Sequence, residues 1–298
     1  MTSNIETKPS VVDRVRPVRR RRNPKATAVR RSILPTVVLW VSLLVFLFPL
    51  AWFVLSSFKP GGELFRYPLT FWPETFTLDG FFLAWERVDF ARYFGNTLFV
   101  STITTVLTVF FSASTGYALA KYKARWLNLL FLCILATTML PTEVILNPTF
   151  AVIRDLGLYN TLGGIIIPSV ITATGIFMFR QFFITVPDEL IDAARMDGAS
   201  EMGIFFRIML PLAQPIIVTL AIFSFQWRWN DYIWPLLVLN DPDQFTIQVA
   251  LRSLIGAENI DWSVLLSASV ISIIPLAIIF LVFQKYVMSA DLNSGLKD

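Results

Sequence analysis

The chain has no histidine and a single cysteine, Cys133, among its 298 residues. Histidine is the side chain that most often exchanges protons near neutral pH and binds transition metals, so its absence excludes much familiar catalysis. One thiol supports neither an internal disulfide nor a thiolate cluster, and we expect no metal site. Because Cys133 lies inside a hydrophobic run, we expect a small buried apolar side chain without chemistry.

Charged residues and phosphate-binding loops are scarce as well. Charged residues make up 15% of the chain and hydrophobic residues 55%, whereas an ordinary globular protein has about 25% charged residues. The 13 glycines are scattered, and none precedes a lysine. A phosphate-binding loop needs such a cluster, so the chain is expected neither to hydrolyse nucleotide itself nor to carry a cofactor. The composition indicates a membrane protein.

Hydrophobic runs long enough to cross a bilayer recur along the chain. A hydrocarbon core about 30 Å thick needs about 20 apolar residues per spanning helix. We expect six spans, at roughly 33–58, 94–120, 126–147, 163–183, 212–239 and 263–287. The predicted fold is therefore an all-α membrane protein. Its transmembrane domain, 32–290, follows a disordered basic tail at 1–31 and precedes a short tail at 291–298.

The basic tail indicates on which side of the membrane the two termini lie. Most of the 25 lysines and arginines lie in the tail or in segments that six spans place on the same side of the membrane. Cytoplasmic segments are enriched in these residues, so we expect both termini in the cytoplasm. Nucleic-acid binding by the tail is the alternative, but its direct continuation into a span favours the orientation role. That span is too long for a cleavable signal peptide.

One polar island, PDELIDAARMDGASE at 187–201, interrupts the hydrophobic runs. Thr185 and Asp188 form a variant capping box and Gly198 is a favourable stop, which predicts a short helix. Its apolar face holds Leu190, Ile191, Ala193 and Ala194, and its charged face holds Asp188, Glu189, Asp192 and Arg195. The helix is too short to span, and its acidic face suits a protein partner at the membrane surface better than anionic lipid. A solvated loop is the alternative.

The segment PDELIDAARMDGASEMGIFFRIMLPLAQP resembles the EAA motif of ATP-binding-cassette importer permeases. That motif reads Glu-Ala-Ala, then glycine after three residues, then Ile-x-Leu-Pro. Here it is represented by Asp192, Ala193, Ala194, Gly198 and Ile208 to Pro211. Asp192 replaces the family's glutamate with a side chain one methylene shorter. SSFKP, YFGNTLFVS, GYALAKYK and FQWRWNDYIWPLLVLND are similar to the carbohydrate-uptake branch, in particular to proteins like the smaller permease subunit of the maltose importer.

The resemblance implies a type I importer permease fold with a coupling helix, within 185–210, that seats in a groove of a cytoplasmic ATPase subunit. The residues it assigns to this contact are Glu189, Asp192, Ala193, Ala194, Arg195, Asp197, Gly198 and Ala199. The implied partners are a second permease subunit, an ATPase dimer that binds ATP and Mg, and an extracytoplasmic sugar-binding protein. The implied location is the bacterial cytoplasmic membrane, and no nucleic acid is expected.

The implied function is to form half of the translocation path of a sugar importer and to couple ATPase closure to alternating access. An importer of the same superfamily for another solute, such as a glycerol phosphodiester or a polyol, is an alternative. An ion-coupled carrier is a further alternative. The only acid within a span apart from Asp231 is Glu143, so no row of buried carboxylates supports ion coupling.

The aromatic fifth span is the candidate substrate path. Phe223, Trp227, Asn230 and Trp234 fall on one face of a continuous helix over 212–239. Aromatic ring faces pack against the C–H side of a sugar while an amide exchanges hydrogen bonds with hydroxyls. An aromatic belt at the membrane interface is the alternative. Arg228 and Asp231, three residues apart, are expected to form a structural ion pair rather than a proton relay.

The outside loop at 240–262 is long enough to reach a docked protein. The corresponding loop of similar permeases contacts the sugar-binding protein. The resemblance therefore assigns the binding-protein contact to Asp241, Asp243, Gly256 and Trp262.

Overall fold

The computed structural model describes residues 33–87, 89–255 and 260–292, and every regular element in these ranges is a helix. The all-α prediction is confirmed. The chain divides into two units, residues 1–50 and 51–298. Helix α1, Ile33–Ser56, crosses this division, and its large apolar side chains in the first unit, such as Leu44 and Phe46, are exposed. The predicted tail at 1–31 and most of the one at 291–298 lie outside the described residues.

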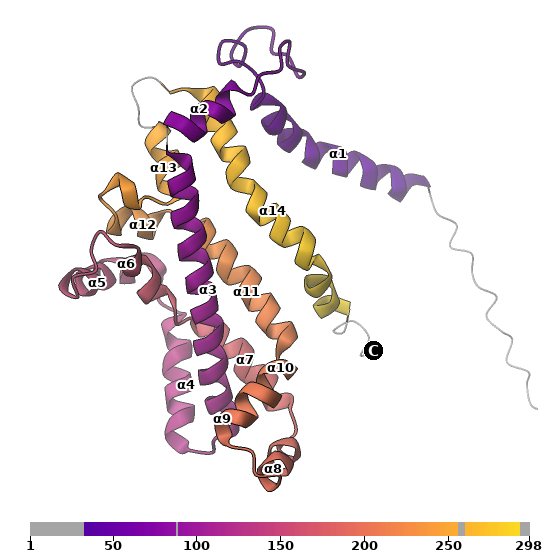
Figure 1. The fold of residues 1–298 in the computed structure, drawn as a ribbon. Helices are drawn as coiled ribbons and strands as arrows, with labels where there is room; N and C mark the ends of the chain where they lie inside the picture. The colour runs from indigo at the N-terminus through magenta and orange to yellow at the C-terminus, as the bar shows by residue number, and fades with distance from the viewer. Residues whose placement is uncertain (1–32, 88, 256–259, 293–298) are drawn as a thin grey trace, which may run out of the picture. The chain divides into compact units, whose positions relative to one another are not determined.

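The second unit contains the other helices (Figure 1). They are α2 (Asp79–Arg87), α3 (Phe90–Lys121), α4 (Arg125–Thr137), α5 (Thr142–Asp155), α6 (Leu162–Ile166), the 3₁₀ turn η1 (Ile167–Ser169), α7 (Ala173–Thr185), α8 (Asp188–Met196), α9 (Glu201–Ile204), a π-helical stretch (Phe205–Met209), α10 (Leu210–Leu212), α11 (Gln214–Trp229), α12 (Ile233–Val238), the 3₁₀ turn η3 (Pro242–Gln244), α13 (Ile247–Ile255) and α14 (Trp262–Leu292).

Four helical segments among the described residues are long and apolar enough to cross a membrane: Pro35–Ser56, Phe90–Lys121, Leu162–Thr185 and Trp262–Gln284. Two bent pairs raise the number to six if each pair is one span. Helices α4 and α5 meet at 107°, and the segment 201–212 meets α11 at 76°. Six spans therefore fit the chain.

The third and fifth predicted spans are not straight helices, which corrects the expected ranges 126–147 and 212–239. Pro141 precedes α5, and a proline restricts the residue before it to extended backbone. The fifth span is bent at Ala213, and its helix α11 begins at Gln214 and ends at Trp229. Hydrophobicity continues through both breaks, so a hydropathy pattern alone does not reveal them.

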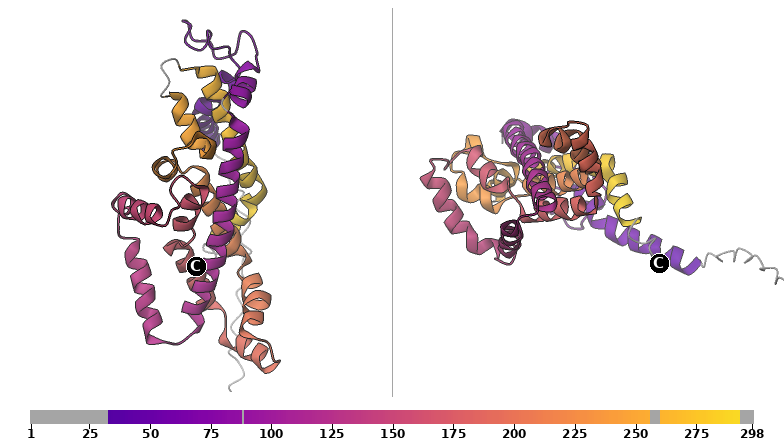
Figure 2. Two further views of the ribbon diagram at one scale, coloured as in Figure 1. Left: turned by 60° about the vertical axis from the view of Figure 1, so that its left-hand side comes forward. Right: turned by 90° about the horizontal axis from the view of Figure 1, so that it is seen from below.

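Helix α3 runs alongside α7 and α11 (Figures 1 and 2). A Cβ atom placed on Gly116 of α3 would lie 2.6 Å from Phe179 Cβ and 2.9 Å from the Arg180 backbone nitrogen on α7. The missing side chain thus allows close backbone approach, as in many membrane helix pairs. Tyr117 and Phe183 are buried in the same cluster. This contact fixes the end of α3 that carries Lys121.

Helix α4 buries Leu127 and Phe131 against α3 and α7. Cys133, on the same helix, is exposed in this chain, which corrects the expectation of a buried side chain. Positions 131 and 133 point about 200° apart around a helix, so packing through Phe131 turns Cys133 outward.

Replacing Gly116 with alanine is expected to destabilise the α3–α7 contact by about 1–3 kcal/mol, because the new methyl group overpacks the interface. Gly95→Ala on the same helix is the matched control, since a Cβ there meets nothing within 4 Å. Unfolding in mixed detergent and SDS micelles measures both. Equal stability of the two variants would contradict the packing role of Gly116.

Candidate functional site

The polar island forms helix α8, Asp188–Met196, directly after α7. Thr185 belongs to the end of α7, where its hydroxyl donates to the Phe182 carbonyl at 2.7 Å. Pro187 is the N-cap of α8 and makes no side-chain capping bond, so the predicted Thr185–Asp188 capping box is wrong. The proline places the chain in extended geometry here, and Thr185 finds its acceptor in the preceding turn.

Gly198 ends α8 as predicted. Its φ is 79°, in the left-handed region that favours glycine. The Gly198 N–H donates to the Arg195 carbonyl at 3.0 Å, and the Ala199 N–H donates to the Ala194 carbonyl at 3.0 Å. These two bonds form a Schellman motif, which satisfies carbonyls that the helix leaves unpaired.

The predicted apolar face of α8 divides between the core and the surface. Ile191 and Ala194 are buried in a cluster with Phe183 and Ile204. Leu190 and Ala193, also predicted on that face, are exposed. Only the inner half of the face therefore anchors α8 to its own chain. The outer half is a surface of small and apolar side chains.

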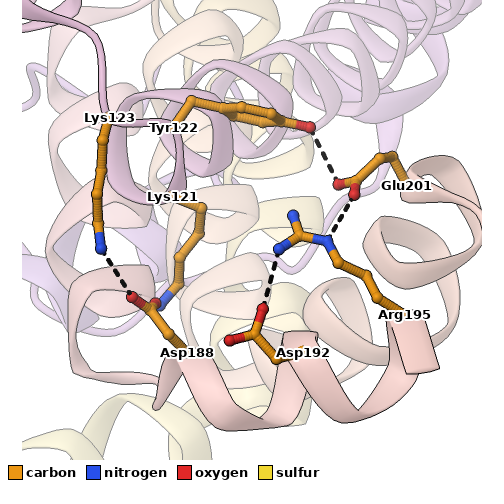
Figure 3. Close-up of polar contacts among 7 residues, drawn as sticks. All are labelled: Lys121, Tyr122, Lys123, Asp188, Asp192, Arg195 and Glu201. Atoms are coloured by element: carbon orange, nitrogen blue, oxygen red, sulfur yellow. Dashed lines mark hydrogen bonds and ion pairs between the residues drawn. The ribbon is translucent and has the colours of Figure 1, made fainter.

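Polar contacts join α8 to the end of α3 (Figure 3). Lys121 Nζ donates to Asp188 Oδ1 at 2.7 Å and to the Val186 carbonyl at 2.6 Å, and the lysine side chain is only 6% exposed. Lys123 Nζ lies 3.8 Å from Asp188 Oδ2. The short link from α7 to α8, at Val186 and Asp188, is thus tied to one almost buried ammonium group.

A second set of contacts holds α8 to α9 (Figure 3). Arg195 donates through Nη1 to Asp192 Oδ1 at 3.1 Å and through Nε to Glu201 Oε1 at 2.8 Å. The Tyr122 hydroxyl donates to Glu201 Oε2 at 3.1 Å. Asp192, the departure from the EAA motif, therefore pairs within its own helix.

These carboxylates were expected to face a partner, and the structure gives three of them partners in the chain. Asp188, Asp192 and Glu201 are paired as described above. Within the ranges that the structure describes, Glu189 and Asp197 form no ion pair. Lys121 and Tyr122, which hold the island, lie 67 and 79 positions away in the sequence from Asp188 and Glu201, so no local pattern predicts these contacts.

The paired carboxylates are stabilised in their charged form. The hydrogen bond from Lys121 lowers the pKa of Asp188, and the hydrogen bond from Arg195 lowers the pKa of Glu201. A carboxyl group whose pKa is lowered on folding stabilises the fold above its unfolded pKa and loses that contribution as pH falls through the folded pKa. The contribution of these two carboxylates is therefore fully present at neutral pH and is lost as the pH falls into the acid range.

A cavity of about 660 Å³ opens beside the end of α8. Its lining residues are Gly198, Ala199, Ser200, Met202, Gly203, Phe206, Arg207 and Ile208. Two glycines and one alanine in this lining leave room for an inserted side chain of another protein. The predicted residues Gly198 and Ala199 thus lie at a concave surface.

The aromatic residues predicted as a substrate path are arranged differently from the single helical face expected. Helix α11 ends at Trp229, and Asn230 is its C-cap. A turn at 230–232 leads into α12, where the Trp234 indole N–H donates to the Gly164 carbonyl at 3.2 Å. The face is therefore interrupted because the helix ends between Trp227 and Trp234.

A second cavity, of about 670 Å³, nevertheless brings three of these four residues together. Trp227, Asn230 and Trp234 line it, whereas Phe223 is not in the lining and stacks on Trp227 with ring centroids 6.2 Å apart. The predicted pair of Arg228 and Asp231 is confirmed at 3.2 Å.

The loop at 240–262 is held by contacts within the chain. Asp241 accepts a hydrogen bond from the Asp243 backbone at 3.0 Å, and the Asp243 carboxylate pairs with Arg92. Trp262 packs edge-on against Phe65 at 5.5 Å. Gly256 lies outside the described residues. The binding-protein contact of these four residues stays a prediction.

Comparisons with known proteins identify relatives across most of the chain. The family model of the binding-protein-dependent transport system inner membrane component matches residues 109–289. An arabinooligosaccharides transport system permease protein, AraQ of Bacillus subtilis, is 37% identical over 280 residues, which are 93% of this chain and 99% of the relative. AraQ of Halalkalibacterium halodurans is 39% identical over 84% of this chain and 91% of its own length.

A further sequence relative and a solved structure are also similar to this chain. The sn-glycerol-3-phosphate transport system permease protein UgpE of Escherichia coli is 32% identical over 85% of this chain and 93% of the relative. A crystal structure of a bacterial ABC transporter involved in the import of the acidic polysaccharide alginate contains a similar chain, with a TM-score of 0.78 and 27% identity. The match covers 85% of this chain and 95% of that one.

Asp188→Asn is expected to increase amide hydrogen exchange several-fold in α8, because Lys121 then loses its charged partner while remaining almost buried. Asp155→Asn is the matched control, since Asp155 is exposed and pairs with its neighbour Arg154 at 3.0 Å. Exchange is measured at one neutral pH by mass spectrometry. Unchanged exchange in α8 would show that its apolar anchor alone positions the helix.

Proposed function

The chain belongs to the family of binding-protein-dependent transport system inner membrane components, and on that premise we propose that it is one permease subunit of an ATP-driven sugar importer. The family consists of transport components rather than enzymes. The arabinooligosaccharide permease proteins that match this chain support a sugar as the solute. The proposal pairs the chain with a second, different permease subunit, an ATPase dimer and an extracytoplasmic sugar-binding protein.

The observation that carries the coupling role is the geometry of α8. A short helix lies between two membrane segments, with one face anchored in its own chain and small or apolar residues on the other. The adjoining 660 Å³ cavity is concave and contains glycines. We assign this surface, including Ala193, Gly198 and Ala199, to contact with the ATPase subunit, which supplies ATP and Mg.

The proposed orientation places α8 and both termini in the cytoplasm. The distribution of lysine and arginine along the sequence supports it. The loop at 240–262 then lies outside, where Asp241, Asp243, Gly256 and Trp262 are proposed to contact the binding protein.

The proposed mechanism is mechanical. Closure of the ATPase dimer pulls the α8 segments of the two permease subunits together, and the spans open outward to receive solute. Because this chain supplies no chemical energy, each state must be stabilised by differential contacts with its partners. The ion pair of Lys121 with Asp188, together with the bonds of Tyr122 and Arg195 to Glu201, transmits the movement of α8 to the end of α3.

A phosphorylated polyol is the second candidate solute, because the sn-glycerol-3-phosphate permease protein matches this chain at 32% identity. Binding assays on the partner binding protein separate the two candidates. Preferential binding of a sugar supports the first, and preferential binding of glycerol 3-phosphate supports the second.

Gly198→Asn is expected to reduce uptake several-fold while the complex still assembles and hydrolyses ATP. Asparagine tolerates the left-handed backbone, so the main change is a side chain that obstructs close docking. Gly157→Asn is the matched control, because Gly157 has φ 72° and, like Gly198, no atom within 4 Å of an added Cβ. Wild-type uptake by the Gly198 variant would remove α8 from the coupling role.

Trp227→Ala is expected to reduce solute uptake in proteoliposomes while leaving assembly with the ATPase unchanged, because it removes an aromatic wall of the 670 Å³ cavity. Trp126→Ala on α4 is the control, an exposed tryptophan that does not line this cavity. If uptake kinetics are identical in both variants, Trp227 belongs to an interfacial aromatic belt.

A further inference from the structure

The 670 Å³ cavity is lined by three interruptions of the helical structure. One is the start of α5 after the α4–α5 bend, the second is the stretch at 168–172 between α6 and α7, and the third is the turn at 230–232 between α11 and α12. Backbone that leaves helical geometry within a membrane is tolerated where it is covered by protein or lines a polar cavity. Three breaks at one cavity therefore indicate a polar site rather than a packing defect.

The lining combines aromatic rings with hydrogen-bonding groups. Trp227, Tyr232 and Trp234 supply ring surface, and Trp234 is fixed by its bond to the Gly164 carbonyl. The Asn230 amide nitrogen donates to the Gln226 carbonyl at 3.0 Å, which leaves the amide oxygen as an acceptor. Rings together with short polar groups suit a solute that has apolar C–H faces and many hydroxyl groups.

Arg228 is held in the cavity wall by two contacts. Its Nη1 donates to Ser169 Oγ at 2.8 Å and to Asp231 Oδ2 at 3.2 Å. Both bonds use the same nitrogen, and a guanidinium group has five N–H donors. Among the contacts of the described residues, the N–H groups on Nε and Nη2 are left over. They form a rigid donor array whose charge is balanced by Asp231.

The cavity lining contains more negative than positive side chains. Arg228 is positive, Asp231 and Glu143 are negative, and no other charged side chain lines the cavity among the described residues. The Arg228–Asp231 pair is neutral as a unit, so Glu143 gives the lining a net negative charge. The Glu143 side chain is exposed, so its repulsion of a second anion acts through water and weakens as the salt concentration rises.

We propose that the cavity is a binding site for an uncharged polyhydroxylated solute, with Arg228 and Asp231 as hydrogen-bonding groups and Glu143 as the residue that disfavours anions. This inference rests on the proposed importer function and narrows its solute class. Hydroxyl groups donate to Asp231 and accept from Arg228 without a change in charge. A phosphate or uronate would bind Arg228, but it would compete with Asp231 and be repelled by Glu143.

The test uses the complex of this chain with its second permease and ATPase in lipid nanodiscs, without the binding protein, so that the permease site is measured alone. Binding of arabinotriose and of digalacturonate, an uncharged and an anionic sugar, is titrated into the millimolar range by calorimetry. We expect arabinotriose to bind and digalacturonate, which carries two carboxylates, to bind several-fold more weakly at low salt concentration. Glu143→Gln should reduce the ratio of the arabinotriose affinity to the digalacturonate affinity, and Glu143→Lys should reduce this ratio further or reverse the preference.

Glu86→Lys is the matched control, because it makes the same charge change at an exposed position of α2 away from the cavity. It should leave the ratio unchanged. A ratio that does not respond to Glu143→Lys, or that responds equally to Glu86→Lys, overturns the charge selection. Failure of both sugars to bind overturns the site.

Uptake by the complete importer, measured in parallel with its binding protein, keeps the two proposals apart. ATP-dependent uptake of arabinotriose without binding at this cavity leaves the importer function standing and removes only the site. Absence of ATP-dependent uptake of any sugar, with arabinotriose binding retained, contradicts the importer function instead.

Discussion

The need to satisfy backbone hydrogen bonds away from water governs this structure. Each spanning segment is helical because a helix pairs its own N–H and C=O groups. The interruptions of the helices are therefore the places where backbone groups need other partners, and three of these interruptions line the 670 Å³ cavity. The buried bond from Trp234 to the Gly164 carbonyl and the contact of Arg228 with Ser169 hold two of these breaks together. The constraint that makes the chain helical thus also determines where polar chemistry can lie.

The α8 segment obeys a different constraint: its own chain holds it firmly, and in the proposed function it also presents a surface to another chain. Ile191 and Ala194 provide the anchor, and Lys121 ties Asp188 to the end of α3. Since the Lys121 side chain is almost buried, this ion pair is screened less by salt than a pair on an open surface. The close approach of α3 to α7 at Gly116 fixes the lysine in turn. Packing inside the spans therefore positions the polar surface outside them.

Local features of the sequence predicted local structure well. The Gly198 stop, the Arg228–Asp231 pair and the long apolar helices depend on neighbouring residues or on hydropathy, and each is present. The helix break at Pro141 was missed because the hydrophobic pattern continues through it. The break at Asn230 was missed because the apolar runs on both sides of the polar residues Arg228, Asn230 and Asp231 were joined into one span. The partners of Asp188 and Glu201 were missed because 67 and 79 residues separate them from Lys121 and Tyr122. Such contacts follow from tertiary packing and have no local signature.

Because α11 begins directly after the break at Ala213, a rotation at this break displaces the far end of α11 most. The segment 201–212, which includes a stretch of π-helix and lines the 660 Å³ cavity, meets α11 at 76°. Helix α11 has 16 residues and is about 24 Å long, so a tilt of about 10° at Ala213 displaces its far end by about 4 Å. That displacement exceeds the length of a hydrogen bond, about 3 Å. A small rotation at one cavity is thus enough to detach Arg228 from Ser169 in the other when Ser169 does not move with α11.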